Sequence, residues 1–223
     1  MTRRHLGRVA LLVAAVSALG GCDRLYYGTM KKFGYEKRDI LIGRVRDARK
    51  AQSEAQEEFK SALDRFREVV GAEGGKLEDK YEKLNGELKR AEDRANAVHD
   101  RVKAVSDVAD DLFKEWEKEL GQYSDRRMRA ESEKELRVTR ERTEGLIAAM
   151  QRSEKRIDPV LRPLRDRVLF LKHNLNAKAL GGLTGELTSI QGDVDALVAD
   201  LQASVAEADG FIKTMQAEQK EAQ

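Results

Sequence analysis

LEDKYEKLNGELKRAEDRANAVHDRVKAVSDVADDLFKEW, residues 77–116, is the stretch that decides the fold. Its apolar residues recur at alternating steps of four and three, an average of about 3.5 residues. Such a repeat, sustained over this length, predicts a long helix that packs in a left-handed supercoil. We call this line of residues the seam of the helix. It consists of Leu77, Tyr81, Leu84, Leu88, Ala91, Ala95, Val98, Val102, Val105, Ala109, Leu112 and Trp116.

Seams of the same kind precede and follow this stretch, and they predict further long helices. The preceding seam contains one polar residue, Gln52, among its apolar residues. We expect Gln52 to set the register in which the helices pack. That seam consists of Leu41, Val45, Ala48, Gln52, Ala55, Phe59, Ala62, Phe66 and Val69. The last seam in the chain consists of Leu183, Leu187, Ile190, Val194, Leu197, Leu201, Ser204, Ala208, Phe211 and Met215.

The segment from about residue 125 to 178 has a weaker seam, because hydroxyl-bearing residues and methionine replace leucine. Its first half consists of Met128, Ser132, Leu136, Thr139, Thr143, Leu146, Met150, Ser153 and Ile157. Asp158 and Pro159 suit an N-cap and the first helical position, and Pro163 follows one turn later. We therefore predict a kink near Pro159 and Pro163. The second half is more apolar, with Val160, Leu164, Val168, Leu171 and Leu175.

Short glycine-containing stretches separate these segments. We expect turns at 71–75 and 121–124, with Ser124 as the next N-cap, and an end of the third helix at Gly181 and Gly182. Short turns favour antiparallel neighbours. The predicted fold is therefore all-α, an elongated antiparallel bundle or coiled coil of about four long helices over residues 36–216. Residues 217–223 are expected to fray, and pairing of some seams between two chains is left open.

The N-terminus has the features of a bacterial lipoprotein signal peptide. Three arginines precede an apolar run from Val9 to Leu19, which is too short to span a bilayer. The run ends in Leu19-Gly20-Gly21-Cys22, and Cys22 is the only cysteine. We predict a signal peptide at 1–21, acylation of Cys22 and a lipid-anchored tether at 22–35. The protein would then face the periplasm on either the inner or the outer membrane.

Composition excludes several classes of function. The whole chain has 42 Lys and Arg against 40 Asp and Glu, and loss of the three signal-peptide arginines leaves 39 against 40. A nearly neutral mature chain gives no basis for nucleic-acid binding. Nucleotide-binding GxxxxGK[ST], hydrolase GxSxG, zinc-binding HExxH and redox CxxC motifs are all missing from the sequence. We expect no enzyme activity, no cofactor and no metal.

Two polar clusters are the candidate binding residues. Asparagine is a poor helix former, so the first cluster is interpreted as a partner-docking patch, with a solvated helix end as the alternative. It comprises Lys172, His173, Asn174 and Asn176. The second is interpreted as a contact for anionic lipid or a partner, with a charged helix start as the alternative. It comprises Lys37, Arg38, Arg44 and Arg46. Trp116 and Phe113 are expected in the core, although tryptophan also anchors interfaces.

Four stretches resemble a bacterial family, the domain-of-unknown-function family 2959. They are FGYEKRDILIGRVRDARKAQSEAQ at 33–56, LFKEWEKEL at 112–120, DPVLRPLRDRVLFLKHNLNAKAL at 158–180 and SVAEADGFIKTM at 204–215. The resemblance covers most of the mature chain, and its most specific parts are KRDIL and VLFLKHNLNA. It implies an envelope lipoprotein rich in coiled coil, and it implies no activity or catalytic residue.

We weigh three functions. The first is a non-enzymatic envelope scaffold, tether or adaptor, anchored in the membrane through Cys22, with a protein partner in the envelope or a second copy of the chain. The second is a membrane-shaping helical protein, which requires a basic face. The third is a carrier of lipid or another apolar ligand, held where the hydroxyl-rich seam of the third helix leaves space.

Overall fold

The computed structural model describes residues 37–72, 74–174 and 177–221, and within these ranges every regular element is a helix. The predicted signal peptide at 1–21 and tether at 22–35 lie outside the described residues, as do Leu175 and Asn176. The helices are α2 (Lys37–Gly71), α3 (Leu77–Leu120), α4 (Arg126–Lys155), α5 (Ile157–His173) and α6 (Ala177–Glu221). α6 continues into the stretch predicted to fray.

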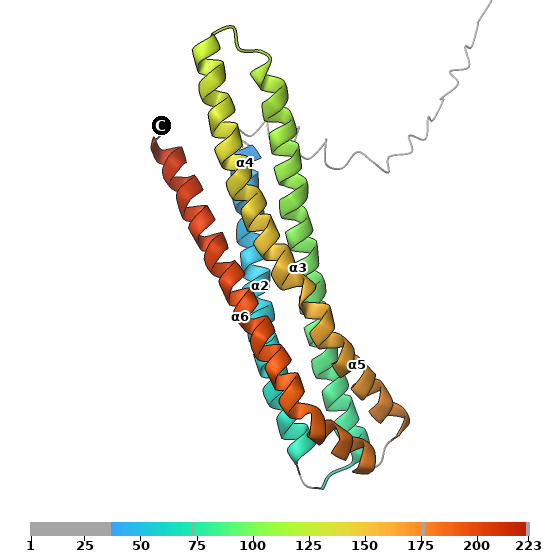
Figure 1. Cartoon of the computed structure of the whole chain (residues 1–223). Coiled ribbons are helices and arrows are strands. Elements are labelled where there is room, and N and C mark those ends of the chain that lie inside the picture. The colour runs from blue at the N-terminus through green and yellow to red at the C-terminus, as the bar shows by residue number, and fades with distance from the viewer. Residues whose placement is uncertain (1–36, 73, 175–176, 222–223) are drawn as a thin grey trace, which may run out of the picture. The chain divides into compact units, whose positions relative to one another are not determined.

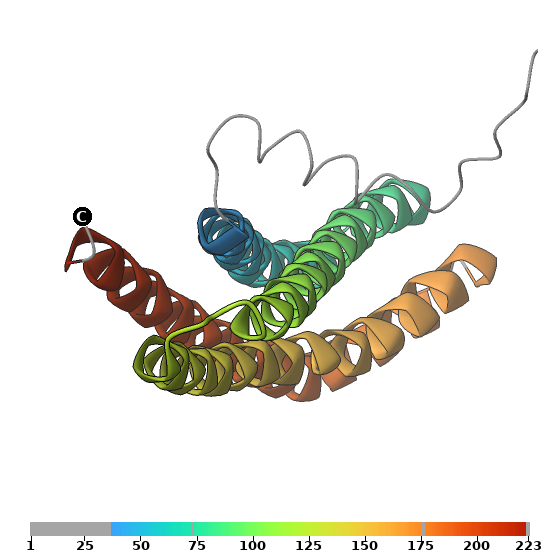
Figure 2. The same ribbon diagram turned by 90° about the horizontal axis from the view of Figure 1, so that it is seen from above.

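The helices form four antiparallel rods, because α4 and α5 follow one another along a single bent rod (Figure 1). α2 packs against α3 and α6, and the α4–α5 rod packs against the same two helices. In the view from above, α2 lies between α3 and α6 (Figure 2). The α4–α5 rod curves along the side of α3 and α6 that faces away from α2. The predicted all-α antiparallel bundle is therefore confirmed.

Ion pairs between neighbouring helices follow the antiparallel register. Between α2 and α3, Glu54 pairs with Arg94 at 2.7 Å and Glu58 pairs with Arg90 at 3.3 Å. Between α4 and α6, Arg142 pairs with Glu218, and Arg156 pairs with Asp200 at 2.6 Å. Each exposed pair of this kind stabilises the fold by roughly 0–1 kcal/mol. These pairs therefore contribute more to the register between the helices than to the stability of the fold.

The seams form most of the core, with departures from the prediction that include two stretches, in α2 and in α4. In α2 the predicted seam is buried as far as Phe59, but then Leu63 and Val70 are buried while Ala62 and Val69 are only half-buried. A straight α-helix has about 3.6 residues per turn, so its buried face drifts away from a strict heptad. In α4 the predicted seam residue Met128 is 59% exposed, because it lies in the first turn of α4 and this end of the helix continues past α2 and α6 (Figure 1).

A buried polar layer joins three of the rods. Gln52 of α2 is fully buried and its Nε2 donates to Ser153 Oγ of α4 at 2.9 Å. Its Oε1 accepts from Ser204 Oγ of α6 at 3.0 Å. Ser153 Oγ also donates to the Met150 carbonyl at 2.8 Å, so the layer is hydrogen-bonded throughout. The hydroxyls that weakened the predicted seam of the third helix therefore have partners in the core.

The first two predicted turns are present. α2 ends at Gly71, and Gly74 and Gly75 have φ of 73° and 81°, a region that favours glycine. Lys80 reaches back to donate to the Ala72 carbonyl. At the second turn the N-cap is Asp125 rather than the predicted Ser124. The Asp125 carboxylate accepts from the backbone N–H groups of Arg127 and Met128, since a carboxylate at that position reaches both donors.

The predicted kink of the third helix is present, whereas its capping residues and the last turn differ from the prediction. The third rod breaks at Arg156, and Ile157 begins α5, so Asp158 is not an N-cap and Pro159 is not the first helical residue. The predicted end at Gly181 and Gly182 is wrong, because both lie inside α6. The chain turns at Asn174, whose backbone N–H and side-chain Nδ2 both donate to the Phe170 carbonyl. Glycine permits a turn but does not impose one.

Candidate functional site

The predicted docking patch lies at the C-terminal end of α5. Lys172 and His173 are exposed in the last turn, where positive side chains suit the helix dipole. Asn174 is the C-cap, with the two hydrogen bonds to Phe170 described above. It therefore has the helix-end role that the alternative interpretation expected, and Asn176 lies outside the described residues. Lys172 and His173 are the members available to a partner.

Two large apolar residues beside this patch were missed by sequence reasoning. Leu169 and Phe170 are 52% and 51% exposed, whereas their neighbours Val168 and Leu171 are buried. We call Leu169, Phe170, Lys172 and His173 the α5 surface. A signal was present in VLFLKH, because a seam of Val168 and Leu171 leaves two adjacent large apolar residues without a core position. Because these two exposed apolar residues adjoin, the α5 surface is a candidate docking surface.

The basic cluster at the start of α2 is largely engaged with α3. Lys37 pairs with Glu115 at 3.0 Å and donates to the Asp111 carbonyl, and the Arg38 guanidinium lies 5.1 Å from the centre of the Trp116 ring. Further along α2, Arg44 pairs with Asp47 at 4.0 Å and Arg46 is exposed. The first two residues of the cluster thus fasten the start of α2 to α3.

The aromatic pair on α3 joins that helix to α4. Phe113 is buried, as predicted, and the Arg140 guanidinium lies 5.0 Å from its ring centre. Trp116 is half-buried, and its indole Nε1 donates to Ser132 Oγ at 2.8 Å. Trp116 is therefore partly core and partly surface, held by α2 on one side and α4 on the other.

A polar groove of about 440 Å³ runs between α3 and the bend of the α4–α5 rod. It is lined by Glu92, Asn96, His99, Glu154, Asp158 and Arg165 with three apolar residues. His99 Nδ1 lies 2.7 Å from Glu154 Oε1, and this hydrogen bond and charge raise the pKa of His99 above its ordinary value of 6.5. Arg165 pairs with Glu92 across the groove at 2.7 Å.

The carrier hypothesis expected space along the hydroxyl-rich seam of the third helix. Thr139, Thr143, Met150 and Ser153 are at most 2% exposed and packed. A core cavity of about 20 Å³ lies elsewhere, among Phe59, Phe66, Leu88, Leu164 and Ile190, and holds about one water-sized sphere. Among the described residues, no three His, Cys, Asp or Glu side chains gather to hold a metal ion. None of the described helices is long and apolar enough to cross a membrane.

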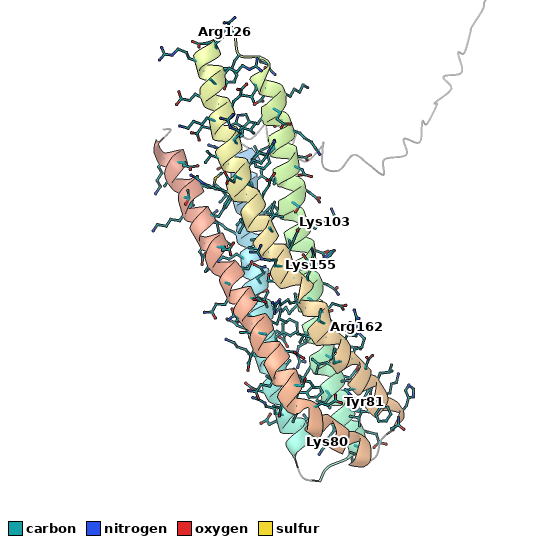
Figure 3. The ribbon with its side chains drawn as sticks, in the orientation of Figure 1. Lys80, Tyr81, Lys103, Arg126, Lys155 and Arg162 are labelled. Carbon is teal, nitrogen blue, oxygen red and sulfur yellow. The ribbon has the colours of Figure 1, made fainter. Side chains whose placement is uncertain are left out.

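Another surface missed from the sequence is the tip where α3 meets α4. All residues from 121 to 131 are exposed, including Tyr123 at 40% and Met128 at 59%. Three arginines, Arg126, Arg127 and Arg129, begin α4 here, and Figure 3 shows Arg126 at the end of the bundle. We call residues 121–130 the hairpin tip.

Comparison with known proteins identifies a family but no characterised relative. The sequence model of DUF2959, described as a protein of unknown function, matches residues 26–215. A search of curated proteins found no match. The matched range includes the α5 surface, the hairpin tip and the buried polar layer.

Proposed function

The chain belongs to DUF2959, a family of unknown function, and on that premise we propose that it is a non-enzymatic lipoprotein of the cell envelope. It acts as a scaffold, tether or adaptor, attached to the membrane through an acyl group on Cys22. The helical rods present a docking surface to a partner in the envelope. The partner is an envelope protein or a second copy of the chain.

The observation that carries this proposal is the exposed Leu169–Phe170 pair on a bundle whose core is filled. Most seam residues are buried and the polar layer joins three rods in register, so the bundle is a stiff support. Several charges elsewhere on the rods are paired between helices. This pairing favours an adaptor over a membrane-shaping protein, which needs a basic face. A matching partner offers an apolar surface with a carboxylate for Lys172.

The anchor is tested by Cys22→Ala. We expect the variant to leave a membrane fraction that has been washed with high salt, which screens contacts between surface charges. It should keep the helical circular dichroism of the parent, because Cys22 precedes all described helices. A matched control is Ser53→Ala, a small-residue change within α2. Attachment of Cys22→Ala that persists after the salt wash would count against a lipid anchor.

Docking at the α5 surface is tested by cross-linking in cells. A photoreactive amino acid replaces Asp166, which is exposed one turn before Phe170, or Arg152, which is exposed on α4 as a control position. We expect one dominant adduct from position 166 alone, and its loss when Phe170→Glu is added. Adducts from both positions, or an adduct indifferent to Phe170→Glu, would refute docking there. An adduct of the chain with itself would identify a self-assembling scaffold.

A further inference from the structure

The hairpin tip extends beyond the rest of the bundle. α2 begins at Lys37, which pairs with Glu115 of α3, and α6 near its end pairs Glu218 with Arg142 of α4. Arg126 precedes Arg142 by 16 residues, so at about 1.5 Å per residue α4 rises roughly 24 Å past that pair. Figure 1 shows α3 and α4 continuing past the ends of α2 and α6 as a two-helix hairpin.

The chemistry of the hairpin tip differs from that of the rods below it. Residues 121–130 contain three arginines and one acidic residue, Asp125. The Asp125 carboxylate is occupied as a helix cap by two backbone N–H groups. Arg129 pairs with Glu133 at 2.9 Å, which leaves Arg126 and Arg127 as the foremost positive charges. Tyr123 and Met128 lie exposed between these charges.

We propose that the hairpin tip rests on an anionic lipid surface, and that this contact sets the bundle upright on the membrane; the proposal rests on the lipid anchor proposed above. Arginine pairs well with lipid phosphate, tyrosine favours the membrane interface and the methionine side chain is apolar. Each basic residue near such a surface strengthens binding by about fivefold.

The length of chain before α2 makes the two membrane contacts compatible. Lys37 contacts α3 at Asp111 and Glu115, nine and five residues and so roughly 8–14 Å from the end of that helix. Fourteen residues lie between Cys22 and Lys37, and this stretch of chain spans at most about 50 Å. An acyl group on Cys22 can therefore enter the same bilayer that the hairpin tip touches.

This orientation directs the α5 surface away from the membrane. The C-terminal end of α5 lies at the end of the bundle opposite the tip, where Arg167 pairs with Glu186 near the start of α6 (Figure 1). The Leu169–Phe170 pair then faces outward from the bilayer. A bundle that lay flat would not hold its docking surface at a set height.

The test uses the chain from residue 22 onward with Cys22→Ser, so that no acyl group contributes. Binding is measured by flotation with vesicles of phosphatidylglycerol and phosphatidylcholine in equal parts, and with phosphatidylcholine alone. We expect binding to the anionic vesicles only. The double variant Arg126→Glu/Arg127→Glu should weaken it more than about tenfold, given the contribution of each basic residue. Arg152→Glu/Lys155→Glu makes the same change in charge further along α4 and should leave binding within about twofold.

A second readout locates the contact. With Cys22 replaced, the chain has no other cysteine, so a fluorophore sensitive to its surroundings can be placed uniquely by Tyr123→Cys or, as a control, by Lys155→Cys. Anionic vesicles should shift the emission of the label at 123 and not that at 155. No binding to anionic vesicles, or equal loss in both double variants, overturns the proposal. If Cys22→Ala still releases the protein in cells, the anchor stands although the tip contact has failed.

Discussion

Gln52 is the residue at which three helices of the bundle meet. The sequence placed it in a seam and suggested a role in register, and the structure adds its two partners, Ser153 and Ser204. A buried amide costs free energy unless its polar atoms are hydrogen-bonded. Both of its side-chain polar atoms have partners here, so a shift of any of the three helices would leave a buried group unpaired.

The first prediction concerns this layer. Gln52→Ala should lower the free energy of unfolding by about 2–4 kcal/mol, because it leaves a cavity and strips Ser204 of its acceptor. Urea denaturation followed by circular dichroism measures the change. The control is Gln202→Ala, the same substitution at an exposed position of α6, for which we expect less than about 0.5 kcal/mol.

Replacing the whole layer sharpens the same test. Gln52→Leu combined with Ser153→Ala and Ser204→Ala removes all three polar groups, so that no buried hydroxyl is left without a partner. We expect stability at or above that of the parent, as is seen when buried polar groups are replaced together by apolar ones. A triple variant weaker than Gln52→Ala would mean that the layer stabilises the fold directly.

The pKa of His99 depends on the carboxylate of Glu154. Glu154→Gln should lower the pKa of His99 toward 6.5, because it removes the carboxylate that raises it. Titration of the imidazole by NMR measures the pKa, and Glu131→Gln, exposed at the far end of α4, is the control. A pKa unchanged by Glu154→Gln would show that this pair does not persist in solution.

The pair of His99 and Glu154 makes the stability of the fold depend on pH. The pKa of His99 is raised in the folded state, so its contribution is complete below pH 6.5 and disappears as pH rises through the folded pKa. The difference in stability between the parent and His99→Gln should shrink accordingly as pH rises. The His99 side chain is 63% exposed, so the effect should weaken further with added salt.

At the scale of elements, the α4–α5 rod shows how two prolines act differently. The break at Arg156 places Pro159 in the first turn of α5, where a backbone N–H has no partner within the helix. Pro163 lies inside α5, where it removes a hydrogen bond and crowds the preceding turn. The bend lets the rod pack on α3 and α6 along both halves.

The two prolines therefore form a matched pair. Pro163→Ala should raise the free energy of unfolding by about 1–3 kcal/mol, because it restores a helical hydrogen bond at an exposed position. Pro159→Ala should change it by less than about 0.5 kcal/mol. Thermal unfolding measures the stability of both variants. A gain in stability of equal size in both would mean that α5 does not begin at Ile157.

At the scale of the described bundle, stability is expected to vary along its length. Four rods pack around Gln52, whereas the hairpin tip has only α3 against α4, held by Trp116, Leu120 and Leu136. Local opening costs less where fewer apolar contacts are broken.

Hydrogen exchange followed by mass spectrometry tests this gradient. Peptides from residues 121–131 should exchange first, and peptides from residues 140–153 of the same helix should exchange among the last. The comparison has an internal control, because residues 126–131 of the first peptide and all of the second lie in α4. Equal protection along α4 would mean that the hairpin tip is held by contacts beyond those of α3 and α4.

The sequence by itself determined the fold class and most of the core. Period and turn signals are local, so Val98, Val102 and Val105 could be placed in a seam, and 71–75 in a turn, without knowledge of other helices. Gln52 was also identified, because a polar residue in an otherwise apolar line stands out. The same local reasoning put the cap at Ser124 and the last turn at Gly181, where the structure has Asp125 and Asn174.

Tertiary structure alone decided which residues are left exposed. Seam position predicted Met128 to be buried, yet α2 and α6 stop short of it, and helix ends depend on packing partners far away in the chain. Leu169 and Phe170 stay exposed because α3 and α6 cover only the opposite side of α5. Periodicity determines which face of a helix is apolar, but only the neighbouring helices determine how far along its length that face is covered.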